Sequence, residues 1–449
     1  MEPTEWRKTM KEFDKVIGYE PIKQQLIQIA DVLKNHEIYA ALGASSPRGL
    51  LLHGEPGVGK TLMAKCLIEA SGRSVYTCRK AESNGKFVKT ISNTFAEAAE
   101  NAPSIVFLDD MDKFANDDER HRNSDEYVAV QTGIDEVKGE EVFVLATAND
   151  LDNLPHSLLR AGRFDRTIEV EAPRGNDAVK IIERYLQGKN LAEDLDPSLL
   201  ARILVGRSSA ALETVANEAG LLAGYRRDRQ VGMNHLIEAC LQSVFNVPGD
   251  YVNDSRAVRL DGMGTESQVI WHEAGHTVVS ELLLPGSVAL VTARRNADAG
   301  GTSGLTVHDT KSGNNLNDAR WDMLISLAGR AAIEIKLGTL DTGTSSDLDH
   351  AFRIASGLQR SVCQHGFFLH GAGGFSSSET LEYQRELAAA VIIEDAYRQV
   401  KEMLAANIGF LDAIAGALAE KPLLTAPEIA EIRESCQHSV TSALCHQHA

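Results

Sequence analysis

Short apolar runs alternate with helix-forming stretches along the first third of the chain. The runs are bounded by turn residues, as buried strands are, and they occupy residues 49–54, 104–110 and 142–149. An amphipathic helical pattern precedes them, from Pro21 to about Ala41. Strands that alternate with helices usually pair in parallel, so the pattern predicts an α/β fold with a mostly parallel sheet.

The rest of the chain has a mainly helical pattern. Helical periodicity from Asn176 to about Phe245 predicts a small all-α lid. Residues 246–264 are rich in Gly, Pro and Asp and have no clear period, which indicates a linker. Helical patterns resume at Glu266 and are interrupted by a strand-like segment at residues 288–309. We expect the polar tail that follows Glu434 to be frayed.

These patterns divide the chain into successive segments. They are an N-terminal lead-in (1–16), an α/β subdomain (17–172), a helical lid subdomain (173–245), a linker (246–264), a mainly α-helical domain (265–435) and a polar tail (436–449). A length of 449 residues accommodates them, because a typical domain has about 100 to 200 residues.

The acidic balance of the chain limits the partners to be expected. Lys and Arg total 45 and Asp and Glu total 63, so the formal net charge is −18. A negative protein is repelled by nucleic acid and by an anionic membrane surface, so we expect neither as a direct partner. With 43% hydrophobic and 24% charged residues, the composition is that of a folded globular protein.

Cysteine spacing and hydropathy indicate the compartment. The six cysteines form no C-x-x-C pair, which argues against a zinc ribbon or a disulfide framework and favours a reducing environment. No uncharged apolar run reaches the about 20 residues that span a bilayer, and the charged N-terminus lacks the apolar core of a signal peptide. We therefore expect a cytoplasmic protein without a transmembrane segment in this chain. Recruitment to a membrane through a partner remains open.

A glycine-rich loop with the pattern G-x-x-x-x-G-K-T follows the first apolar run and opens a helix. Its residues are Gly54, Glu55, Pro56, Gly57, Val58, Gly59, Lys60 and Thr61, and Leu62 follows in the helix. Glycine lets backbone N–H groups curl around phosphate oxygens, and the helix N-terminus adds positive potential. We expect Lys60 to reach the β and γ phosphates of ATP and the Thr61 hydroxyl to bind Mg²⁺. The flanking strand and helix favour this site over an incidental glycine-rich turn.

Asp109 and Asn149 each end an apolar run. A carboxylate at the end of a buried strand beside a phosphate loop is placed to hold Mg²⁺ through water, so Asp109 is the candidate for that role. Asn149 is a candidate to orient the attacking water. For Asp109 alone, a cap at the end of a strand is the alternative.

Residues 158–166, LLRAGRFDR, extend these features into a resemblance to the AAA+ ATPases. The segment is similar to the family's second region of homology, in which two arginines reach the γ phosphate held by a neighbouring subunit. The resemblance assigns that role to Arg163 and Arg166 and implies a ring, usually a hexamer. An arginine supplied in trans stabilises transition-state charge, with an effect of about 10³ to 10⁵ on the rate. Taken alone, such arginines more often form surface salt bridges.

A second motif, H-E-x-x-H, lies in a helical pattern at residues 272–276. His272 and His276 are four residues apart, so on a helix both imidazoles project from nearly one face and can share a zinc ion. Glu273 lies beside that face, where its carboxylate can accept a proton from the attacking water. A structural histidine pair is the alternative.

Together the two regions resemble the FtsH family of ATP-dependent zinc metalloproteases over nearly the whole chain. The family's third zinc ligand is an aspartate in a segment similar to residues 341–351, DTGTSSDLDHA, which maps to Asp347. A set of two histidines and one carboxylate leaves an open position for water, as catalytic zinc requires. Asp349 and His350 are neighbouring competitors, and Glu334 is a plausible hydrogen-bond partner for a ligand.

The chain departs from the family in several respects. Family members are usually anchored by N-terminal membrane spans, and this chain, which begins at the ATPase region, is not expected to share them. Where the family has a glutamate that polarises the attacking water, this chain has Asp110. Aspartate is one methylene shorter and reaches the attacking water less well. Because a general base typically accelerates a reaction by about 10² to 10⁴, we expect slower ATP hydrolysis. We predict that Asp110→Glu raises ATPase turnover.

The loop that contacts the threaded substrate also differs. The family carries an aromatic residue there in a Phe-Val-Gly pattern, whereas counting back from Phe95 places Ser83, Asn84 and Gly85 at that loop. The triplet Phe87-Val88-Lys89 would fit only if the alignment slipped. A polar loop buries little apolar area on contact with an extended chain, so we expect a preference for loosely folded or short substrates.

These features predict a homo-oligomeric, cytoplasmic AAA+ zinc endopeptidase that uses ATP, Mg²⁺ and Zn²⁺ and degrades polypeptides inside its ring. Two alternatives remain open. One is an AAA+ chaperone or remodelling factor with a decayed protease domain. The other is a zinc peptidase with a weakly active, regulatory ATPase ring.

Overall fold

The chain forms two compact units, Met1–Met233 and Asn234–Ala449. The division falls at Met233, inside the lid that the sequence predicts to extend to residue 245. The computed structural model describes residues 11–80, 87–115, 124–160, 162–247, 259–261, 264–295, 303–309, 315–340, 345–362 and 379–446.

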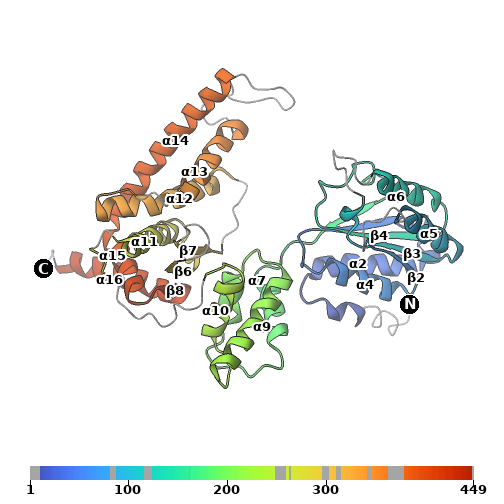
Figure 1. Ribbon diagram of the computed structural model, residues 1–449, viewed down its shortest axis with the longest axis horizontal. Helices are drawn as coiled ribbons and strands as arrows, with labels where there is room; N and C mark the ends of the chain where they lie inside the picture. The colour runs from blue at the N-terminus through green and yellow to red at the C-terminus, as the bar shows by residue number, and fades with distance from the viewer. Residues whose placement is uncertain are drawn as a thin grey trace. The chain divides into compact units, whose positions relative to one another are not determined.

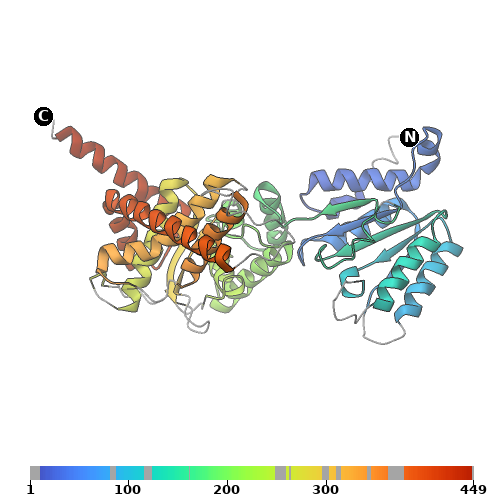
Figure 2. The same ribbon diagram turned by 90° about the horizontal axis from the view of Figure 1, so that it is seen from above.

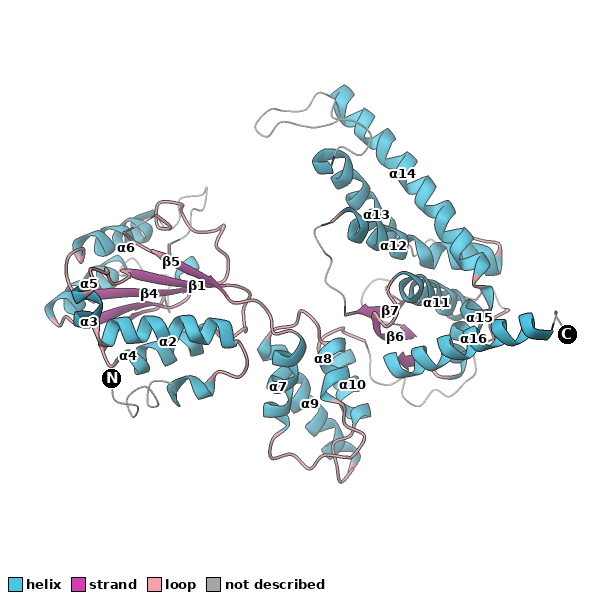
Figure 3. Cartoon of the chain, turned by 180° about the vertical axis from the view of Figure 1, so that it is seen from behind, coloured by secondary structure: helices cyan, strands magenta, loops and turns pink. Residues whose placement is uncertain are grey.

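A five-stranded parallel sheet forms the centre of the first unit. Its strands are β1 (Gly49–His53), β2 (Ser74–Cys78), β3 (Ser104–Leu108), β4 (Val142–Ala148) and β5 (Arg166–Glu169). Their spatial order is β2-β3-β4-β1-β5, and each neighbouring pair is parallel. Helices α2 (Glu20–Lys34) and α4 (Lys60–Ser71) cover one face, and α5 (Phe87–Glu100) and α6 (Ser124–Glu136) cover the other (Figures 1 and 3). The predicted α/β fold with a parallel sheet is confirmed.

The three central strands β1, β3 and β4 are the three apolar runs of the sequence. Nearly all of their side chains are buried, because helices cover both faces of the sheet. The sequence pattern does not predict the edge strands β2 and β5, since most of their side chains are polar or exposed. The carboxyl ends of all five strands lie at one edge of the sheet, which is where open α/β sheets bind their ligands.

Two helices replace the single helix predicted from Pro21 to about Ala41. α2 ends at Lys34, and α3 (His36–Ala41) follows after Asn35, whose backbone leaves the helical conformation. The other helical elements of this unit are η1 (Phe13–Lys15), η2 (Met111–Lys113), α7 (Gly175–Leu186), α8 (Pro197–Ile203) and α9 (Ser209–Arg226). The helix α10 (Met233–Ser243) begins at the last residue of the first unit and continues into the second.

The second unit packs long helices against a small antiparallel sheet (Figure 1). Its further helices are α11 (Thr265–Leu283), α12 (Leu316–Leu337), α13 (Ser345–Gly357), the π-helical turn η4 (Leu358–Val362), α14 (Glu379–Ala406), α15 (Ile408–Glu420) and α16 (Ala426–His446). Its strands are β6 (Val288–Arg295), β7 (Ser303–His308) and β8 (Leu423–Thr425), in the order β7-β6-β8. α11 packs against α12, α15 and β6 and buries most of its residues. The mainly helical character predicted for this part of the chain is confirmed.

The helix α16 runs into the tail that we expect to be frayed after Glu434. It continues to His446, and its last turns extend past the other helices of the second unit (Figure 2). Residues 435–446 contain neither Gly nor Pro, so no helix breaker interrupts the chain there.

Within the described ranges, no single helix has both the length and the apolar character needed to cross a membrane. α14 and α15 meet that criterion only when taken together, and the two are bent against each other by 80°.

Candidate functional site

The glycine-rich loop connects β1 to α4 at the carboxyl edge of the sheet. Gly54 has φ +141°, and a Cβ there would lie 2.2 Å from the carbonyl oxygen of Val170, so only glycine fits. Gly59 caps the N-terminus of α4 in the left-handed region, with φ 104°. The loop therefore turns sharply and directs the first N–H groups of α4 to one side, as phosphate binding requires.

Lys60 is buried beneath this loop and is fully hydrogen bonded. Its Nζ donates to the carbonyl oxygens of Gly54 (2.7 Å) and Glu55 (2.8 Å) and to Oδ1 of Asn149 (3.0 Å). Burial lowers the pKa of Lys60, and the nearby carboxylates led by Asp110 oppose that shift. The loop and the predicted Asn149 are thus brought together around one ammonium group.

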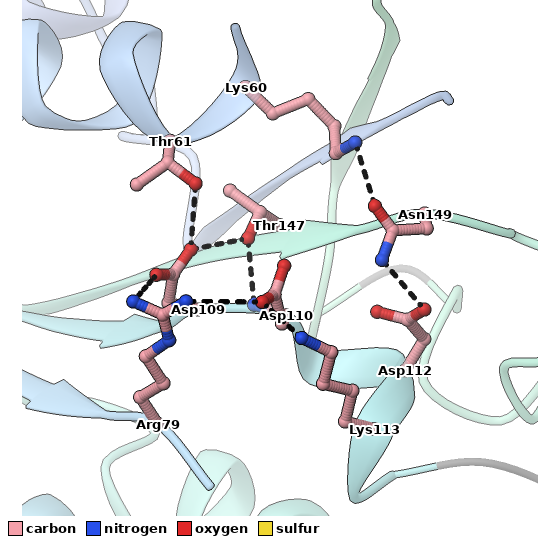
Figure 4. A network of polar contacts seen from close by, with 9 residues as sticks. All are labelled: Lys60, Thr61, Arg79, Asp109, Asp110, Asp112, Lys113, Thr147 and Asn149. Carbon is pink, nitrogen blue, oxygen red and sulfur yellow. Dashed lines mark hydrogen bonds and ion pairs between the residues drawn. The ribbon is translucent and has the colours of Figure 1, made fainter. Parts of the chain in front are cut away.

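The candidate magnesium residues Thr61 and Asp109 are also adjacent. Oδ1 of Asp109 accepts hydrogen bonds from the hydroxyls of Thr61 (3.0 Å) and Thr147 (2.9 Å) (Figure 4). The Thr147 hydroxyl in turn accepts the backbone N–H of Asp110 at 2.9 Å. A hydroxyl and a carboxylate at one point form an oxygen donor set that fits Mg²⁺. The sequence did not indicate Thr147 as a site residue, because it lies inside an apolar strand with no motif around it.

Asp110 begins the short helix η2 with a left-handed backbone, at φ 55° and ψ 51°. Aspartate tolerates this region better than most residues. Its Oδ2 accepts a hydrogen bond from Lys113 Nζ at 2.7 Å. Nearby, Nδ2 of Asn149 donates to Oδ2 of Asp112 at 3.3 Å, so Asn149 connects Lys60 to η2 (Figure 4).

A cavity of about 250 Å³ adjoins the glycine-rich loop within the first unit. Apolar side chains of the N-terminal segment, the loop, α4 and the lid contribute to its lining: Val16, Ile17, Val58, Leu62, Ile181 and Ala210. An apolar pocket beside a phosphate loop is suited to the flat base of a nucleotide.

Of the two predicted trans-acting arginines, Arg163 is paired within its own chain. Its Nη2 lies 2.8 Å from Oδ2 of Asp135, and its Nη1 donates to the carbonyl oxygen of Ser157 at 2.6 Å. The hydrogen bond from Arg163 lowers the pKa of Asp135. Arg166 is exposed at the start of β5. The contacts of Arg163 are those of a salt-bridge partner, and the reach of both arginines to a neighbouring subunit stays a prediction.

In the second unit, the structure brings together His272, His276 and Asp347. The two Nε2 atoms lie 2.9 Å apart, and Oδ2 of Asp347 lies 3.1 Å from Nε2 of His272 and 3.4 Å from that of His276. Ligands about 2.0 to 2.2 Å from a tetrahedral zinc ion would be about 3.3 Å apart, so the set fits zinc. Asp349 and His350 are exposed and are not part of this group.

Contacts around the ligands favour metal binding. Nδ1 of His276 lies 2.7 Å from the carbonyl oxygen of Ile325, which places the ring proton on Nδ1 and leaves the Nε2 lone pair for the ion. Burial opposes ionisation of Asp347, but the adjacent imidazole rings of His272 and His276 outweigh it and lower the pKa of Asp347. A carboxylate that stays ionised is the form that binds metal.

Glu273 is 4% exposed and lies beside the ligand set. Burial raises the pKa of Glu273 to about 7. The hydroxyl of Thr306, on β7, donates to Oε2 of Glu273 at 2.6 Å. A Cβ at Gly304 on the same strand would lie 2.4 Å from Oε1, so glycine makes room for the carboxylate. Neither Thr306 nor Gly304 belongs to a recognisable motif, and sequence reasoning missed both.

Two further residues of α12 correct or extend the predicted site. Glu334 does not act as the partner of a ligand: its carboxylate accepts hydrogen bonds from Tyr397 (2.6 Å) and Lys401 (2.7 Å) of α14. The Ile325 carbonyl takes that place instead. Gly329 forms the wall behind the imidazoles, because a Cβ there would lie 2.5 Å from Cε1 of His272 and 2.7 Å from Nε2 of His276.

The predicted substrate loop, Ser83, Asn84 and Gly85, lies outside the described residues. The alternative triplet begins at Phe87, whose side chain is buried at the start of α5. Its ring packs edge-on against Phe114 with 5.2 Å between centroids. Phe87 therefore belongs to the core of the first unit and does not face a substrate.

Comparisons with known proteins agree with both halves of this description. Residues 50–172 match the ATPase family associated with various cellular activities (AAA), and residues 263–432 match peptidase family M41. An ATP-dependent zinc metalloprotease FtsH of Caldicellulosiruptor bescii is 30% identical over 94% of this chain and 71% of its own length. One from Helicobacter pylori is 30% identical over 94% of this chain and 70% of its own length. The ATP-dependent zinc metalloprotease FtsH 3 of Synechocystis is 29% identical over 96% of this chain and 73% of its own length.

Proposed function

Because the chain belongs to the FtsH family of ATP-dependent zinc metalloproteases, we propose that its two sites work together as a cytoplasmic, homo-hexameric endopeptidase. The protein is an ATP-dependent zinc metalloprotease that takes ATP and zinc as cofactors. The observation that supports the assignment most strongly is the convergence of His272, His276 and Asp347 in a chain that also carries a complete phosphate loop.

In the nucleotide site, Lys60 and the loop amides hold the phosphates. Thr61 and Asp109 hold Mg²⁺, whose oxygen donors they supply. Asp110 and Asn149 orient and polarise the attacking water. Arg163 and Arg166 act on the nucleotide of a neighbouring subunit, which requires Arg163 to leave Asp135 when the ring assembles.

In the peptidase site, Glu273 is the general base. When bound, zinc supplies Lewis acidity to the scissile carbonyl group and to the attacking water. Glu273 accepts the proton of that water and passes it to the leaving amine, while Thr306 fixes the orientation of its carboxylate. Burial raises the pKa of Glu273, which makes its carboxylate a better proton acceptor.

Unfolded or short polypeptides are the proposed substrates. The polar loop Ser83-Asn84-Gly85 supports weak contact with a threaded chain, since it offers little apolar area. The net charge of −18 and the cysteine pattern support a cytoplasmic location without nucleic-acid partners.

Cleavage of casein by the purified full chain tests the proposal. We expect cleavage that needs ATP, is lost with a zinc chelator and is lost in Lys60→Ala and Asp347→Ala. Asp349→Ala, at an exposed neighbouring carboxylate, is the matched control and should cleave normally. Cleavage that survives in Lys60→Ala would favour a peptidase with a regulatory ATPase ring. ATPase activity without any zinc-dependent cleavage would favour a remodelling factor.

A further inference from the structure

Arg79 lies just beyond β2 and faces the two carboxylates that end β3. Its Nη1 is 3.7 Å from Oδ2 of Asp109, and its Nη2 is 3.6 Å from Oδ2 of Asp110 (Figure 4). The side chain is 63% exposed, so charge rather than packing holds it there. One planar guanidinium thus bridges two neighbouring carboxylates, which a single ammonium group cannot do equally well.

Lys113 approaches the same carboxylate from η2. Its Nζ lies 2.7 Å from Oδ2 of Asp110, the oxygen that also faces Arg79, and its side chain is 54% exposed. Two cations therefore balance the two negative charges of Asp109 and Asp110. We call these four residues the ionic clamp.

The ionic clamp acts on both functions of the carboxylates. Asp110 polarises the attacking water through its negative charge. Two adjacent cations offset that charge, so the carboxylate attracts a proton of the water less strongly. At Asp109, Oδ1 is occupied by hydroxyl groups, so Arg79 faces the remaining oxygen, where it repels a divalent cation.

We propose that Arg79 and Lys113 are positioning residues that slow ATP hydrolysis and weaken divalent-cation binding by restraining Asp110 and Asp109. The inference rests on the ATPase function proposed above. It predicts that the two cations lower the basal ATPase turnover, independently of the missing methylene of Asp110.

ATPase turnover of Arg79→Ala, Lys113→Ala and the double variant tests the clamp. Exposed ion pairs contribute little individually, so we expect kcat to rise about two- to fivefold for each cation removed. Arg79→Lys, which keeps the charge but loses the fork, should fall between wild type and Arg79→Ala. Lys180→Ala removes one positive charge from the exposed surface of the lid and is the matched control, expected to match wild type.

Binding of Mn²⁺, followed by electron paramagnetic resonance in the presence of ADP, gives a readout apart from turnover. Arg79→Ala should bind Mn²⁺ about two- to fivefold more tightly than wild type. Unchanged or lower kcat together with unchanged Mn²⁺ affinity in Arg79→Ala overturns the clamp. If the wild type hydrolyses no ATP, the proposed function fails instead, and the Mn²⁺ titration still decides for or against the clamp.

Discussion

Gly329 on α12 offers a direct test of the metal site, because the change adds one methyl group and no charge. In Gly329→Ala the new Cβ would lie 2.5 Å from Cε1 of His272 and 2.7 Å from Nε2 of His276. An ordinary carbon contact needs about 3.5 Å, so the rings must shift by about 1 Å. Zinc sites tolerate deviations of only about 0.2 Å, and we expect zinc affinity to fall at least about 10- to 100-fold.

Stability should change much less than zinc affinity. Alanine gains about 1 kcal/mol of helix propensity over glycine, and overpacking costs about 1 to 3 kcal/mol, so the metal-free protein should lose at most about 2 kcal/mol. Gly416→Ala on α15 is the control, because a Cβ there meets nothing within 4 Å. That variant gains the same propensity without touching the ligands.

The assay measures zinc content after dialysis against a graded series of chelator concentrations, with circular dichroism to verify the fold and casein cleavage as the activity. We expect Gly416→Ala to match wild type and Gly329→Ala to lose zinc at lower chelator concentrations. If folded Gly329→Ala holds zinc with wild-type affinity, the packing of α12 against the imidazoles is not as described, and the reasoning is refuted.

Four further substitutions address single contacts. Glu273→Gln should lower casein cleavage by about 10² to 10⁴ while zinc content and ATPase rate stay unchanged; cleavage near the wild-type rate would remove Glu273 as the base. Thr306→Val should lower kcat for peptide cleavage by about 10- to 100-fold, since a hydrogen bond to a charged group contributes about 1.5 to 3 kcal/mol, and an unchanged kcat would show that Glu273 is oriented without it. Asp110→Glu should raise ATPase turnover in a coupled assay, and an equal or lower rate would show that the aspartate is already well placed. Thr147→Val should lower ATPase turnover without weakening binding of a fluorescent ATP analogue, because Asp109 loses a hydrogen bond; weaker binding and unchanged turnover would contradict this role.

The parts of the fold that the sequence predicts are those where one physical requirement dominates. β1, β3 and β4 are buried on both faces, so their apolar runs are unmistakable. β2 and β5 lie at the edges of the sheet, where exposed positions admit polar residues and the strand pattern disappears. The three-residue strand β8 is too short for any periodicity to be read.

Some residues of the candidate site can likewise be predicted from the sequence, and others become visible only in the fold. His272, Glu273 and His276 are visible in the sequence because helix geometry places neighbours in the chain side by side in space. Asp347 is 71 residues beyond His276 (347 − 276 = 71), and only a family resemblance indicated it before the fold brought the two together. Thr306 contributes through a tertiary contact across the β7–α11 packing, and no local pattern marks such a residue.

Lys60 enters every nucleotide cycle with its ammonium group already satisfied, since three protein oxygens accept its three protons. An incoming phosphate must displace at least one of them, so binding exchanges one set of contacts for another. The net free energy of phosphate binding is therefore smaller than the strength of the new ionic contact alone. The hydrogen bonds that already stabilise the buried ammonium group must first be broken. We therefore expect a moderate affinity for nucleotide, which would let ADP leave after each hydrolysis event.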